Sequence, residues 1–151
     1  MRFTVAALLL AFGAPVGAAD KNEVKAKEAA VAFLKAIKAK DVDAVVKVSA
    51  APFVTLEDET TSVLKDEAAL KTWLKERLEE IKDADKVPTE IDQVIPFADV
   101  KGKIKDEAER KTIEDAVGKD GFVAVFTVDG KMISILVRIK DGKTKVVGVA
   151  R

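Results

Sequence analysis

The chain has 151 residues, with 26 Lys and Arg residues against 26 Asp and Glu residues, and it contains no cysteine, histidine or tyrosine. These absences exclude disulfide frameworks, zinc–thiolate sites, and Ser–His or Cys–His nucleophiles. The near-neutral, finely mixed charge gives no electrostatic reason to expect nucleic acid or an anionic membrane as a partner.

The first 19 residues are typical of a cleavable signal peptide. Arg2 gives a short basic start, residues 3–14 form an apolar run, and Gly17–Ala19 supply small residues for cleavage after Ala18 or Ala19. The apolar run is too short for the competing interpretation as a membrane anchor, which needs about 20 residues. We expect one exported domain over residues 20–151, periplasmic or extracellular, without a membrane or lipid anchor.

Three segments in the first half predict helices. Residues 21–40 carry apolar side chains at helical spacing. A shorter helix follows, capped by Asp41 or Asp43, and ends before Pro52. A third helix begins at its N-cap Asp66.

Strands and one weak helix are predicted between these helices and the final third of the chain. Residues 53–64 predict two short strands joined by a polar turn, and residues 88–97 predict another strand. Asp106 resembles the start of a capping box for a weak helix that ends at Gly118.

The last thirty residues predict three consecutive antiparallel strands, over residues 122–128, 131–139 and 144–150. They are separated by Asp129–Gly130 and Asp141–Gly142, which are strong signals for two-residue hairpin turns. The fold class is therefore α+β, with N-terminal helices packed on a curved antiparallel sheet.

The two-residue turns also predict the strand register. They place Val137 opposite Val146, and continued pairing puts Ile135 opposite Gly148. One face of this sheet is built of Phe, Ile and Val side chains, so the helices must cover it. The opposite, outer face is unusually apolar for a surface exposed to water, so we expect something else to pack on it.

This outer face is the candidate interface, and we expect a homodimer through it. Ser134 is an isolated polar group there that could hydrogen-bond across an interface. The candidate interface residues are Val123, Val125, Met132, Ser134, Leu136, Val147 and Val149.

Arg138 and Lys145 are predicted to lie opposite one another, although like charges in that position are unfavourable. An anion or an acidic partner between them would remove the conflict. The alternative is a solvated strand end.

Three stretches carry a resemblance to a known superfamily. Residues 29–37 followed by Asp41–Ala44, residues 51–54, and the closing hairpin Asp141–Gly148 are similar to motifs of the nuclear transport factor 2-like, or cystatin-like α+β, proteins. Two features depart from the pattern. Thr144 stands where these proteins often have Trp, and the helix predicted after Asp106 replaces a short loop.

The resemblance implies that helices fill a curved sheet to make a cone, which in this superfamily holds ligands or catalytic residues. Trp73 could line such a cone or simply belong to the core. The extra helix could act as a lid or fill part of the pocket. The expected pocket-lining residues are Phe33, Trp73, Phe122, Phe126, Ile133 and Ile135.

Enzymes of that superfamily generally use Asp, His or Tyr inside the cone, which leaves only carboxylates here. Asp92 and Asp99 are the main candidates for a base whose pKa is raised by burial, and the turn residues Glu57, Asp58 and Glu59 are further ones. The alternative is that all five are solvated. The acidic turn lacks the spaced ligands of a calcium loop, so we expect neither metal nor cofactor.

The leading hypothesis is an exported, non-catalytic binding or scaffold domain that holds a small apolar ligand and self-associates through the outer sheet face. One alternative is an isomerase, dehydratase or cyclase that relies on a buried carboxylate. Another is an accessory or inhibitor subunit of a different envelope protein.

Overall fold

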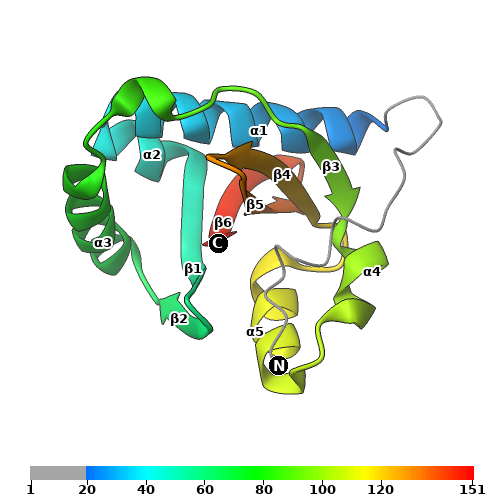
Figure 1. Ribbon diagram of the computed structural model, residues 1–151. Helices are drawn as coiled ribbons and strands as arrows, with labels where there is room; N and C mark the ends of the chain where they lie inside the picture. The colour runs from blue at the N-terminus through cyan, green and yellow to red at the C-terminus, as the bar shows by residue number, and fades with distance from the viewer. Residues whose placement is uncertain (1–19) are drawn as a thin grey trace.

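A computed structural model describes residues 20–151 as helices on both sides of one curved, six-stranded sheet (Figure 1). The predicted signal peptide, residues 1–19, lies outside the described residues. Within residues 20–151, no helix is long and apolar enough to cross a membrane.

The helices and strands follow one another in nearly the predicted order. The helices are α1 (Lys21–Lys38), α2 (Val42–Val48), α3 (Glu67–Glu80), α4 (Phe97–Val100) and α5 (Glu107–Val117), with short 3-10 turns at Ala84–Lys86 and Lys101–Lys103. The strands are β1 (Ser49–Glu57), β2 (Thr60–Leu64), β3 (Gln93–Pro96), β4 (Phe122–Val128), β5 (Lys131–Lys140) and β6 (Lys143–Ala150).

Aspartate caps begin the main helices, as the sequence predicts. The backbone N–H groups of Ala44 and Ala69 donate to the carboxylates of Asp41 and Asp66, at 2.9 and 2.8 Å. Asp106 caps α5 in the same way, and Gly118 ends that helix with φ +78°. Each cap satisfies a backbone donor that the first turn of a helix leaves unpaired.

The strand order is β2-β1-β6-β5-β4-β3, and the sheet is mixed rather than purely antiparallel. β1 runs parallel to β6, whereas the other neighbouring strands are antiparallel. Parallel neighbours need a long connection, and here all the elements from β2 to β5 provide it. Sequence patterns do not show such a distant pairing.

β3 is shorter than the predicted strand over residues 88–97, because only Gln93–Pro96 pair with β4. Pro88 has no backbone N–H to donate to a ladder. The chain from Ile81 to Asp92 instead crosses from α3 to the far edge of the sheet (Figure 1).

A β-bulge shifts the predicted register of β6 by one residue. Val137 lies opposite Val146 as predicted, but Gly148 then pairs with Leu136 instead of Ile135. A Cβ atom on Gly148 would lie 2.5 Å from the backbone oxygen of Val54 and 2.8 Å from Leu136 Cδ1. Glycine therefore lets β1, β5 and β6 approach closely at this point.

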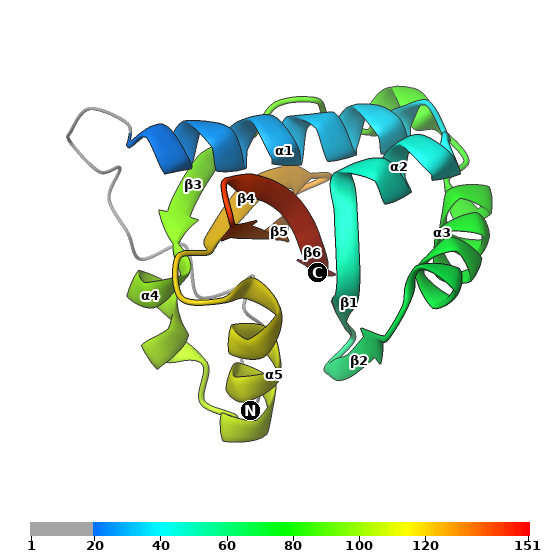
Figure 2. The ribbon, with the colours of Figure 1, turned by 180° about the vertical axis from the view of Figure 1, so that it is seen from behind.

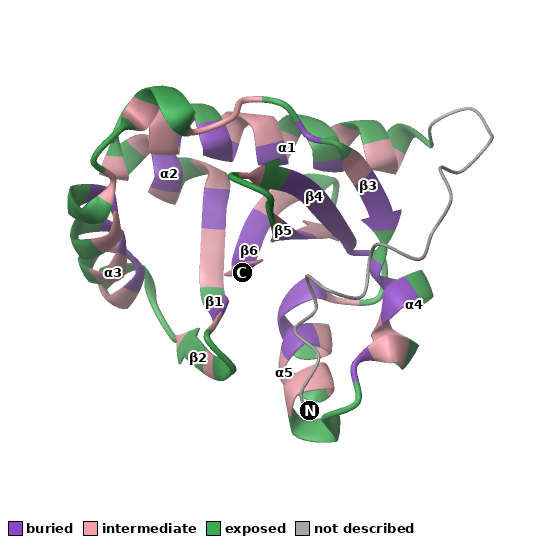
Figure 3. Ribbon diagram, in the orientation of Figure 1, coloured by how far each residue is buried: buried purple, intermediate pink, exposed green. Residues whose placement is uncertain are grey.

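Helices cover both faces of the middle of the sheet (Figures 1 and 2). The helices α1, α2 and α3 cover one face and form the first core. The helices α4 and α5 cover the other face and form a second core. β4 is buried along five consecutive residues for this reason (Figure 3).

Candidate functional site

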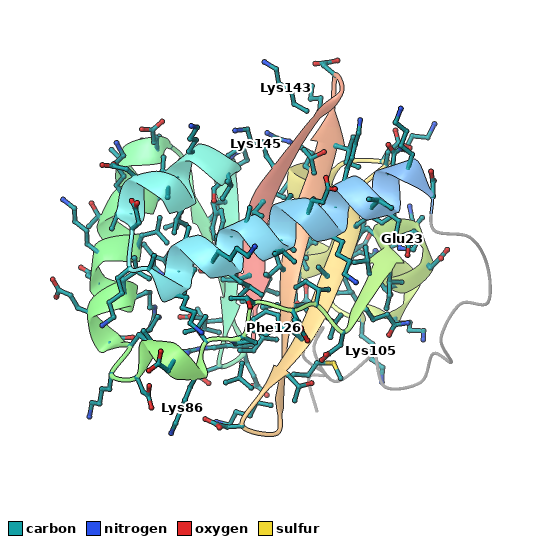
Figure 4. All side chains as sticks on the ribbon, turned by 90° about the horizontal axis from the view of Figure 1, so that it is seen from above. Glu23, Lys86, Lys105, Phe126, Lys143 and Lys145 are labelled. Atoms are coloured by element: carbon teal, nitrogen blue, oxygen red, sulfur yellow. The ribbon has the colours of Figure 1, made fainter. Side chains whose placement is uncertain are left out.

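One pocket of about 460 Å³ remains at the end of the first core. It lies between the segment that follows α3 and the end of the β4–β5 hairpin. Figure 4 shows Phe126 on the hairpin side and Lys86 on the neighbouring segment. Its apolar lining comes from Leu34, Ile81, Val87, Pro88, Phe126, Val128 and Ile133.

Two of the six predicted pocket residues, Phe126 and Ile133, line this pocket. Phe33, Phe122 and Ile135 are buried in the first core, and Trp73 packs against that core.

An aromatic cluster fills the middle of the cone. The Phe53 ring lies 6.4 Å from the Phe33 ring and 5.8 Å from the Trp73 ring, measured between centroids. Trp73 therefore packs as a core residue, and the pocket lies beyond this cluster, at the hairpin end of the cone.

The outer wall of the pocket is the segment of residues 81–88, which the sequence analysis did not identify as part of a site. Lys40 Nζ donates a hydrogen bond to the carbonyl oxygen of Ile81 at one end of it. Beyond its other end, the Asp92 N–H donates to the carbonyl oxygen of Val125 at 2.8 Å. These two contacts hold the segment across the cone.

The rim of the pocket is charged, and its charged groups are exposed. It carries Glu80, Lys82, Asp83, Lys86 and Asp129. Lys86 Nζ lies 4.0 Å from Asp83 Oδ2, and the two side chains form an exposed ion pair. An apolar floor below a solvated polar rim is compatible with binding a small, mainly apolar molecule.

The candidate catalytic carboxylates do not converge on this pocket. Asp92 and Asp99 are exposed, and neither lines it. Asp58 and Glu59 form the exposed β1–β2 turn, with φ +45° and +65°. Within residues 20–151 no group of acidic side chains could hold a metal ion.

Glu57 is the one acid among the five candidates that is largely buried, with 17% of its side chain exposed. Arg77 and Arg151 both form ion pairs with its carboxylate, the latter with Nε 3.4 Å from Oε1. Arg77 also donates to Glu80 at 2.9 Å and lies 5.8 Å from the centre of the Trp73 ring. The hydrogen bond to Glu80 and then the charge of Glu57 raise the pKa of Arg77, although burial opposes them. Glu57 is thus held by two arginines in an ion-pair network.

The predicted interface lies inside the protein. Val123, Val125, Leu136 and Val147 are buried in the second core, and Met132 packs against it. They pack with Ile113, Ala116 and Val117 of α5, so the outer sheet face does not offer a free surface to another copy of the chain. α5, which the sequence predicted as a helix that could be a lid or an insertion, covers this face instead.

The other two predicted interface residues have different positions. The bulge turns Val149 to the first core, where it packs as a partly buried residue. Ser134 is completely buried on the second face, and its hydroxyl has no hydrogen-bond partner within the described part of the chain.

The comparisons with known proteins give structural neighbours only. No protein-family model and no curated protein matches the sequence. One similar solved structure is a nuclear transport factor 2-like protein from Pseudomonas putida, at 7% identity and a TM-score of 0.44, covering 85% of this chain and 83% of that one. Another is described as a calcium/calmodulin-dependent protein kinase II association domain from Xanthomonas campestris, at 13% identity and a TM-score of 0.43, covering 91% and 89%.

The fold class is confirmed by the chain's own architecture. Its helices and curved sheet have the α+β, cone-like arrangement that the resemblance implies. The cone is open at one end and filled in its middle.

Proposed function

We propose that the domain is an exported, non-catalytic binding protein that holds a small apolar ligand in the pocket at the hairpin end of the cone. The single observation that carries the proposal is the pocket itself, with an apolar floor and a charged, solvated rim. Its volume of about 460 Å³ lies within the usual range for small-molecule sites, about 300–1,000 Å³.

The chemistry of the lining supports binding rather than catalysis. The three acids that line the pocket, Glu80, Asp83 and Asp129, are all exposed rim residues. The enzyme alternative needs a carboxylate directed into the cavity, and Asp92 and Asp99 lie elsewhere. The proposal also omits self-association through the outer sheet face, because α4 and α5 cover that face.

Export belongs to the proposal because of the signal-peptide pattern in residues 1–19. Mass spectrometry of the protein recovered from the periplasm or medium tests it. The mass of a chain that begins at Ala19 or Asp20 is expected, and an uncleaved chain in the cytoplasm would contradict it.

Ligand binding can be tested with the neutral fluorescent probe N-phenylnaphthylamine, which emits strongly only in apolar surroundings. Val128→Asp is expected to weaken binding at least about tenfold, because the probe would have to bury a carboxylate in the pocket wall. Because the probe is uncharged, weaker binding could not be explained by charge repulsion between the probe and the new carboxylate. Titration of fluorescence against probe concentration gives the dissociation constant.

Val63→Asp is the matched control. Val63 also lies on a strand, is 41% exposed, and does not line the pocket. The control is expected to bind the probe like the parent protein. Equal affinity of all three proteins, or equal loss in both variants, would contradict a site at the hairpin end.

A further inference from the structure

The β5–β6 hairpin carries four cations on one face. Arg138 lies opposite Lys145, and Lys140 lies opposite Lys143. Directly paired residues point to the same side of a sheet, as do residues two apart along a strand. The four charges therefore form a two-by-two array, with Ile139 and Thr144 on the reverse side.

These cations are not neutralised within the described part of the chain. Arg138, Lys140 and Lys143 make no ion pair there, and Lys145 Nζ donates to the carbonyl oxygen of Lys47 at the end of α2. Within residues 138–145, the only acidic residue is Asp141, which lies in the turn. Two like-charge pairs placed directly opposite one another oppose folding, so an external anion would relieve them.

The array projects from the body of the protein. Figure 4 shows Lys143 at the end of a hairpin that extends past α1. None of the four cations lines the pocket at the other hairpin. An array of charges on one face of a projecting hairpin fits an extended anionic surface better than an enclosed small anion.

We propose that this hairpin docks the domain peripherally on an anionic lipid bilayer. Residues 20–151 carry 25 basic against 26 acidic side chains once Arg2 is removed from the total, a net charge of −1. Attraction to such a surface therefore has to come from a local array, and these four residues provide it. Each basic residue close to an anionic bilayer strengthens partitioning about fivefold.

The test uses residues 20–151, which contain every helix and strand described above, so that the apolar segment 1–19 cannot itself bind lipid. Vesicles of phosphatidylglycerol and phosphatidylcholine are sedimented with the protein at about 0.02 M and about 0.5 M salt. Binding is expected at low salt only, and phosphatidylcholine vesicles alone are expected to bind none. Lys140→Gln with Lys143→Gln should lower the partition coefficient about 25-fold.

The matched control is Lys65→Gln with Lys75→Gln, which makes the same change in net charge at two exposed lysines next to and within α3, away from the hairpin. It is expected to retain binding within about twofold of the parent, because these two lysines lie outside the array that would contact the bilayer. Equal loss in both double variants, binding that survives high salt, or no binding to anionic vesicles would overturn the proposal. Stronger binding to soluble poly-L-glutamate than to the vesicles would also overturn it, in favour of an acidic protein partner.

Discussion

Phe53→Ala is expected to lower the free energy of unfolding by about 3–5 kcal/mol, the usual cost of deleting a buried phenylalanine ring. Phe53 is fully buried where β1 meets α1 and α3, and its ring lies between those of Phe33 and Trp73. The substitution would leave a cavity between two large rings that cannot close completely. Urea denaturation of residues 20–151, followed by circular dichroism, measures the loss.

Val63→Ala is the control for this substitution, because Val63 lies on the neighbouring strand β2 but is 41% exposed. Its expected cost is about 0.5 kcal/mol or less. A cost below about 1 kcal/mol for Phe53→Ala would mean that the middle of the cone is loosely packed. A ligand would then not be confined to the hairpin end.

The second large effect is expected on the opposite side of the sheet. Ile113→Ala should lower the free energy of unfolding by about 2–5 kcal/mol, because Ile113 of α5 is fully buried in the second core. The same urea experiment measures it. Lys111→Ala, at an exposed position of the same helix, should change stability by about 0.5 kcal/mol or less.

This comparison tests whether α5 is a stable cover of the outer sheet face. If that face instead served as an interface between copies, α5 would have to leave it, and Ile113 would contribute little to the folded monomer. Equal, small effects of Ile113→Ala and Lys111→Ala would support that interpretation and contradict the second core.

The structural features that the sequence predicts best are those that depend on residues close together in the chain. The helix caps at Asp41, Asp66 and Asp106 were predictable because a short aspartate side chain accepts a hydrogen bond from the backbone N–H three residues later. The turns at Asp129–Gly130 and Asp141–Gly142 follow from positive φ angles, which both residues of each turn adopt. These local rules gave the three terminal strands and the pairing of Val137 with Val146.

Features that depend on distant residues were not predicted. The parallel pairing of β1 with β6 has no local signal, and the bulge before Gly148 depends on how closely β1 approaches. The sequence did show that the outer face was too apolar for water. It did not show that α5, a predicted weak helix, covers that face rather than a second copy of the chain.

The candidate site was predicted in part for the same reason. Phe126 and Ile133 could be assigned to the concave face from strand alternation. Val87 could not, because it lies in a polar connection that has no period to place it. The net charge is a sum over the whole chain, so it did not indicate the local cluster of cations on the β5–β6 hairpin.

The most direct test of the proposed function is methyl NMR of residues 20–151 during titration with N-phenylnaphthylamine. Shift changes are expected to be concentrated on Leu34, Ile81, Val87, Val128 and Ile133, the methyl-bearing residues that line the pocket. Methyl groups of the second core, such as those of Ile113, should not respond. Changes centred on the second core or on exposed Val63, or no changes at saturating probe, would contradict a binding domain with its site at the hairpin end of the cone.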